Sequence, residues 1–168
     1  MSYVDTLLAE FDTEMKTTRT MLEQVPYGSD ATKPANKSRT MHELAAHIAN
    51  IVRFGDLAIN ANERDFSAPG AAMPATYGSS EELLKVFDTN VAASRAAIQG
   101  LKESTLGDTF TLRRGATVVI ALPRAAALRV LLMNHTIHHR GQLSAYFRLN
   151  DVAHPPIYGP TAEMSGRG

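Results

Sequence analysis

A long stretch of the chain, from Arg124 to Leu149, is almost free of helix-breaking residues. It has no proline and only one glycine, Gly141. The residue before it, Pro123, suits the first turn of a helix, where no backbone N–H donor is needed. The sequence therefore predicts one long helix over residues 124–149. Such a helix is stable in a globular protein when other elements cover its apolar face.

Three further segments space their apolar side chains three or four residues apart, which is the period of one buried helical face. They cover residues 2–24, 41–60 and 80–101. The second and third begin with a capping-box pattern, a serine or threonine followed three residues later by glutamate: Thr40 with Glu43, and Ser79 with Glu82. We therefore expect four helices.

The sequence predicts little regular structure for the segments between these helices. Residues 63–78 contain prolines and glycines without a sustained period, which indicates a long surface connection. Residues 109–120 alternate apolar and polar side chains and then run into β-branched residues, which predicts a short hairpin. We expect an all-α fold, a four-helix bundle with at most a small β-hairpin, in a single domain over residues 1–168.

Composition narrows the functions that such a bundle could have. Lysine plus arginine and aspartate plus glutamate number 17 each, so no overall charge attracts nucleic acid or an anionic membrane. The sequence also lacks a basic stripe with interleaved aromatics, a signal-peptide pattern and an apolar run of the roughly 20 residues that a membrane helix needs. We expect a cytoplasmic protein that binds neither nucleic acid nor membranes.

The histidines are the strongest sign of chemistry. The chain has no cysteine, so a metal site must use histidine, aspartate or glutamate. His135 and His139 lie one helical turn apart on one face, where both rings can approach one ion, whereas His138 lies off that face. A catalytic site of this kind uses three protein ligands. His47 is the best candidate for the third, because it lies on the apolar stripe of the second helix.

Other readings of these histidines remain open. His42 lies off the stripe of the second helix, and His154 lies in a loop where a solvated imidazole needs no partner. Two histidines one turn apart also occur by chance, and a buried histidine is more often hydrogen-bonded than metal-bound. Spacing alone therefore leaves a structural histidine cluster as the alternative. The H-E-x-x-H pattern of zinc peptidases is absent, because position 136 holds threonine.

The stretch "HTIHHRGQLSAYFRLNDVAHPPIYGP", which begins at His135, resembles the DinB family, the DinB/YfiT-like metalloenzymes. Its H-x-x-x-H-R-G-Q run is similar to the family's last helix, and "HELAAHIANIV" resembles the family's second helix with its histidine. The similarity covers nearly the whole chain. It implies an up-down-down-up bundle, often a homodimer, in which the long connection between the second and third helices is a crossover.

By position, the resemblance implies that His47, His135 and His139 hold a divalent ion, Zn²⁺ or Ni²⁺. Some relatives are thiol S-transferases or isomerases, which implies a small-molecule substrate and a low-molecular-weight thiol as cofactor. A bound ion can lower the pKa of a water or a thiol, so hydrolysis and thiol transfer can both start from it. We expect a metal-dependent transferase or hydrolase. The alternative is a non-catalytic metal-binding or dimerisation module.

Residues near the histidines allow further expectations. Arg140 and Gln142 could each orient a ligand or meet an anionic substrate, although a salt bridge on the helix surface is the more common outcome for Arg140. Tyr158 is expected to anchor the C-terminal tail on the bundle. Substrate contacts are expected from the irregular segments 63–78 and 150–165.

Overall fold

Helices account for most of the structure, a computed structural model that describes residues 2–28, 33–153, 155–162 and 164–166. The helical segments are α1 (Tyr3–Leu22), α2 (Met41–Ile51), α3 (Phe54–Asn60), α4 (Ser80–Gln99), the short η1 (Glu103–Thr105), α5 (Arg124–Ala127), the π-helical η2 (Leu128–Asn134) and α6 (His135–Leu149). The strands are β1 (Glu63–Asp65), β2 (Thr109–Arg114) and β3 (Thr117–Pro123). Within the described ranges, α5, η2 and α6 form one continuous rod, and α2 and α3 form another that is interrupted between Ile51 and Phe54.

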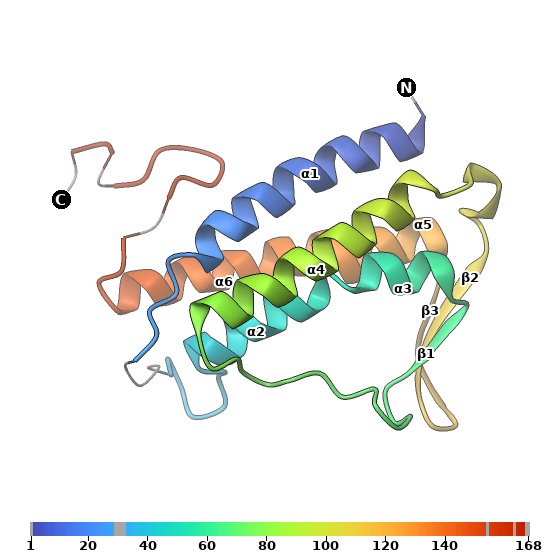
Figure 1. Cartoon of the computed structure of the whole chain (residues 1–168), viewed down its shortest axis with the longest axis horizontal. Coiled ribbons are helices and arrows are strands. Elements are labelled where there is room, and N and C mark those ends of the chain that lie inside the picture. The colour runs from blue at the N-terminus through green and yellow to red at the C-terminus, as the bar shows by residue number, and fades with distance from the viewer. Residues whose placement is uncertain (1, 29–32, 154, 163, 167–168) are drawn as a thin grey trace.

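The four rods run in up-down-down-up order (Figure 1). The α2–α3 rod and α4 point the same way, and α1 and the α5–α6 rod point the opposite way. Two successive parallel rods require the chain to return along the bundle between them, and residues 61–79 make this return. The predicted four-helix bundle and its crossover are confirmed.

The helix starts follow the predicted capping chemistry with one difference. Thr40 and Glu43 form a full capping box at α2, and Ser2 with Asp5 forms another at α1. At α4 the Ser79 hydroxyl accepts from the Glu82 N–H. The Glu82 carboxylate accepts from the N–H of Gly78 and not from that of Ser79. The α4 start is therefore a serine N-cap with a displaced carboxylate.

The second predicted helix, residues 41–60, is interrupted where Ser94 of α4 enters its hydrogen-bond ladder. The Ser94 hydroxyl donates to the Val52 carbonyl at 2.6 Å and accepts from the Asp56 N–H at 3.0 Å. It thereby takes the place of the direct bond between those two backbone groups, which separates α2 from α3. Gly55 permits this close approach, because a Cβ there would lie 2.6 Å from the Ser94 Cβ.

The last rod covers the predicted residues 124–149 but is not a uniform α-helix. Leu128–Asn134 is π-helical, and this wider winding changes which residues share a face. On a uniform α-helix Leu128 would share a face with His135, seven residues later. In the structure Leu128 is fully buried in the core, and His135 shares a hollow with Leu131 instead.

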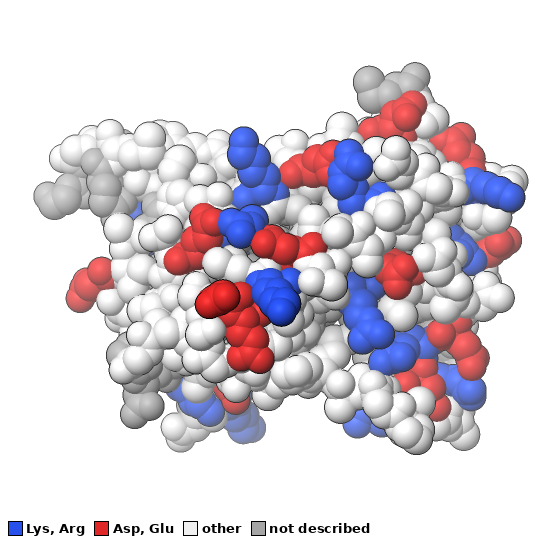
Figure 2. All heavy atoms as spheres, viewed as in Figure 1, with Lys and Arg blue, Asp and Glu red and all other residues white. Residues whose placement is uncertain are grey.

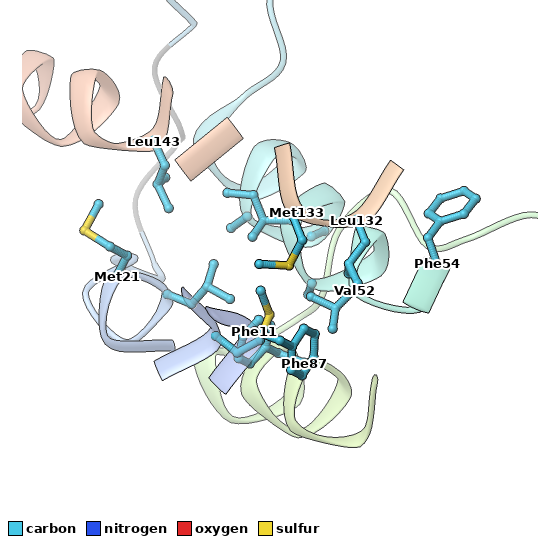
Figure 3. Close-up of a cluster of buried hydrophobic side chains, with 14 of the residues drawn as sticks. Phe11, Met21, Val52, Phe54, Phe87, Leu132, Met133 and Leu143 are labelled. Carbon is cyan, nitrogen blue, oxygen red and sulfur yellow. The ribbon is translucent and has the colours of Figure 1, made fainter. Parts of the chain in front are cut away.

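Side chains from all four rods meet in one core (Figure 3). Phe11 of α1, Phe87 of α4 and Met133 of η2 lie in this cluster and are at most 1% exposed. Phe54 of α3 lies at its end. Burying a large apolar side chain contributes roughly 1.5–3 kcal/mol, so this core holds the rods at fixed positions.

A three-stranded sheet lies beside one end of the bundle (Figure 1). The predicted hairpin is confirmed as β2 and β3, which pair antiparallel, with Gly115 in the left-handed region at φ 59° between them. The sequence did not predict β1, which pairs parallel to β2 from within the long connection. Glu63–Asp65 is short and polar and carries no strand pattern, so only pairing with β2 makes it a strand.

Opposite charges are interspersed on the face shown in Figure 2, without a large patch of one sign there. Arg19 with Asp88, and Arg95 with Asp12, link α1 to α4 at 2.9 Å. Exposed pairs of this kind contribute under about 1 kcal/mol each. Within the described ranges, no helix has both the length and the hydrophobicity needed to cross a membrane.

The role of Ser94 can be tested by replacing it with alanine. Ser94→Ala leaves the Asp56 N–H without its partner, and the Val52 carbonyl keeps only the Gly55 N–H, at 3.2 Å. An unpaired group of this kind costs about 1–3 kcal/mol of unfolding free energy. Thr89→Ala is the control, because the exposed Thr89 hydroxyl bonds only within α4. Urea unfolding followed by circular dichroism measures both. Equal losses in the two variants would contradict the role assigned to Ser94.

Candidate metal centre

The structure brings together the three histidines that the sequence singled out. His47 comes from α2, and His135 and His139 come from the first two turns of α6. Their candidate ligand atoms all lie within 4.8 Å of one another, and the Nε2 atoms of His47 and His139 are 3.1 Å apart. Two nitrogens bound to one tetrahedral Zn²⁺ lie roughly 3.4 Å apart. The group could therefore hold a metal ion.

Hydrogen bonds orient two of the three rings. His139 Nδ1 lies 2.7 Å from Oε1 of Gln142, so Nδ1 is the donor and Nε2 keeps its lone pair toward the cluster. His135 makes a hydrogen bond to the backbone of Leu131, in the π-helical segment. Such partners fix the tautomer and the direction of a metal-binding imidazole. Of the two polar neighbours considered from sequence, Gln142 is the one that orients a candidate ligand.

The three imidazoles are held in their neutral form. Burial, and after it the Arg39 guanidinium, lowers the pKa of His47 from its ordinary 6.5 to about 3. Burial and then the neighbouring His139 lower the pKa of His135 to about 4. Burial also lowers the pKa of His139, although its bond to Gln142 acts in the opposite direction. Neutral imidazoles have free lone pairs, and this is the form that binds a metal.

Three hollows surround the histidines. Two, of about 450 and 420 Å³, share Lys37 and Arg39 in their walls and are called the basic hollows here. The first also contains Lys33 and His47, and the second contains His139 and Gln142. The third, of about 280 Å³, is lined by His47, Ile51, Phe54, Phe66, Met73, Leu112, Leu131 and His135. The cluster is thus accessible from a basic side and from an apolar side.

Sequence reasoning did not identify Arg39. It is exposed, in the segment just before α2, and its charge lowers the pKa of all three histidines. The Tyr146 hydroxyl donates to the Arg39 carbonyl at 2.8 Å, which ties this segment to α6. The only signal in the sequence is a group of basic residues ahead of the Thr40 cap.

Two further histidines lie outside the cluster, as expected. His138 is exposed on α6. The His42 ring stacks on Tyr27 at 4.6 Å, and its Nε2 lies 2.7 Å from the Pro26 carbonyl oxygen. His154, which the sequence also placed outside the site, lies outside the described residues.

The expectation of a surface salt bridge for Arg140 is wrong. Arg140 is 1% exposed and pairs with Glu14 of α1 at 2.5 Å, with a further bond to the Thr18 hydroxyl. The Tyr158 hydroxyl accepts from Arg140 at 2.6 Å and donates to Glu14 at 2.9 Å. Tyr158 therefore anchors the C-terminal segment on α1 and α6, as expected.

With this geometry in view, comparison with known proteins decides the family. The sequence pattern of the DinB family matches residues 1–166. The chain belongs to the DinB family. It is 26% identical to the Bacillus subtilis protein YrdA over 164 residues, which make up 95% of this chain and 90% of YrdA.

Two solved structures share the fold of this DinB-family chain. One is the DinB-like protein YjoA from Bacillus subtilis, with a TM-score of 0.69, 20% identity and coverage of 93% of this chain and 99% of that one. The other is a DinB-like protein from Bacillus cereus ATCC 10987, with a TM-score of 0.68, 19% identity and coverage of 92% and 97%.

The hydrogen bond from His139 to Gln142 leads to a prediction about metal affinity. Gln142→Leu removes the acceptor that holds the ring, and loss of such a partner costs about 10–100-fold in metal affinity. Gln142→Glu retains an acceptor and keeps the affinity. Competition with a coloured chelator measures both variants, and His138→Leu on the exposed side of α6 is the control. Unchanged affinity in Gln142→Leu would refute the orienting role.

The lowered pKa values of His47 and His135 lead to a prediction about the metal-free chain. From pH 6.5 down to about 4, the unfolded chain takes up protons on these residues and the folded chain does not. Stability present above pH 6.5 is therefore lost progressively as the pH falls through this window. His47→Gln should reduce that loss, and Thr89→Ala, which changes no titratable group, should not. Urea unfolding with a chelator present, repeated across the window, tests this; equal slopes in wild type and His47→Gln would contradict it.

Proposed function

We propose that this protein is a divalent-metal-dependent enzyme, a transferase or hydrolase of small molecules, with Zn²⁺ or Ni²⁺ held by His47, His135 and His139. The observation that carries the proposal is that three neutral imidazoles converge while hollows lie open on both sides of them. A structural metal site is closed by its protein ligands, whereas a catalytic one leaves a position for water or substrate. Three ligands beside open hollows fit the second kind.

Each residue of the site has a distinct part in this proposal. The three histidines hold the ion, which supplies a Lewis acid and lowers the pKa of a water or thiol beside it. Gln142 keeps Nε2 of His139 directed at the cluster. Arg39 and Lys37, in the walls of both basic hollows, attract anionic groups such as a thiolate or carboxylate.

Thiol transfer fits these residues better than hydrolysis. Among the described residues in the walls of the three hollows, Glu43 is the one carboxylate, and it accepts from the Thr40 N–H at 2.6 Å as part of the α2 cap. It is thus engaged and poorly placed to act as a general base. In a thiol transfer the thiolate sulfur bonds to an electrophilic carbon, the leaving group departs with its electron pair, and the thiol proton goes to bulk water. That reaction needs no protein carboxylate.

One observation supports a second candidate. The contact of 3.1 Å between His47 and His139 joins α2 to α6, so an ion there would also tie two helices together. In a non-catalytic module the site would serve only to link α2 to α6. Such a module should lose much thermal stability on chelation and show no turnover.

The decisive variant is His135→Ala. We expect it to lose both bound metal and turnover while remaining helical, because only two imidazoles are left. His138→Ala, which removes an exposed imidazole from the same helix, should keep both. Elemental analysis of purified protein, a thiol-conjugation screen against small electrophiles, and circular dichroism provide the readouts. A folded, active and metal-free His135→Ala protein would overturn the proposal.

A further inference from the structure

We propose that the apolar hollow beside His47 and His135 binds the apolar part of the substrate and so selects molecules that carry a phenyl-sized or short alkyl group next to the reacting atom. The proposal rests on the metal-dependent function above and specifies its substrate class. Basic residues line the two basic hollows, whereas the apolar one has no lysine, arginine, aspartate or glutamate among the described residues of its walls.

The walls of the apolar hollow come from every part of the fold around the site. Ile51 ends α2, Phe54 begins α3, Leu112 lies on β2, and Leu131 belongs to the π-helical segment. The Phe54 and Phe66 rings meet edge to face, with centroids 6.2 Å apart. Both the helical bundle and the sheet thus contribute side chains to the walls of this hollow.

The long crossover contributes two of these walls. Phe66 and Met73 both lie in the segment that the sequence marked as a source of substrate contacts, and both are half-buried. Flexible methionine side chains adapt to ligands of different shape. The crossover therefore covers the bundle at the place where two candidate metal ligands, His47 and His135, line the hollow.

Position and size determine what this hollow can take. Of the described residues that line it, only His47 and His135 are polar, so a ligand atom at the ion lies directly beside apolar walls. An apolar cavity of about 150 Å³ is enough for benzene. The hollow of about 280 Å³ therefore has room for a phenyl ring or a short alkyl chain. A charged group there would lose its hydration without gaining a partner.

A series of straight-chain alkyl hydroxamates tests the proposal, because the head group chelates the metal and only the tail changes. We expect the affinity of the metal-loaded protein to rise about fourfold per methylene and then to level off when the tail outgrows the hollow. A tail ending in carboxylate should gain nothing. Calorimetric titration measures these affinities without any turnover.

Two variants locate the tail. Phe66→Ala and Met73→Asp should each weaken binding of long-tailed hydroxamates at least tenfold while leaving acetohydroxamate unchanged. Val119→Asp, at an exposed valine of β3, is the control and should bind all of them as wild type does. This inference alone is overturned if the affinity for hydroxamates does not depend on tail length. It is also overturned if Phe66→Ala and Met73→Asp both show the same dependence on tail length as the wild type. Failure to bind metal and acetohydroxamate overturns the proposed function as well.

Discussion

Burial of imidazoles between α2 and α6 is the constraint on which the site depends. A histidine inside an apolar bundle is costly unless its ring nitrogens have partners. The Nε2 atoms of His47 and His139 face each other at 3.1 Å, and Gln142 receives the other nitrogen of His139. Burial keeps the rings neutral; since Nδ1 of His139 donates to Gln142, its Nε2 accepts from Nε2 of His47, whose proton a bound ion would displace. The contacts that satisfy the ring nitrogens in the metal-free protein therefore also hold the three rings around one point where an ion can bind.

A second buried polar group holds the frame in which this cluster lies. Arg140 follows His139 directly, yet it points the other way and pairs with Glu14 and Tyr158. Breaking a buried pair of this kind is costly because it leaves an uncompensated charge. Arg140 thus ties α6 to α1 while His139 faces α2. Two adjacent residues of α6 therefore have different roles: Arg140 holds α6 on α1, and His139 belongs to the candidate metal site.

The helical backbone is irregular at two places near the site. The α2–α3 break at Ser94 lies one helical turn after His47, and the π-helical segment ends where His135 begins. Both depart from the α-helix that the residue pattern predicts. The π segment leaves Leu128 and Leu132 in the core and Leu131 beside His135. The apolar surroundings of His135 therefore depend on the π-helical winding of this segment.

Local pattern determined the helices, their caps, the β2–β3 hairpin and the choice of His47, His135 and His139, because periodicity and spacing act over a few residues. Tertiary structure alone decided what depends on distant partners. Ser94 divides the second helix from 42 residues away, β1 exists only through β2, and Arg140 is buried because Glu14 lies opposite. The hollows around the histidines likewise arise only where segments distant in sequence meet. The candidate metal ligands could thus be named from sequence, whereas the shape and polarity of what surrounds them could not.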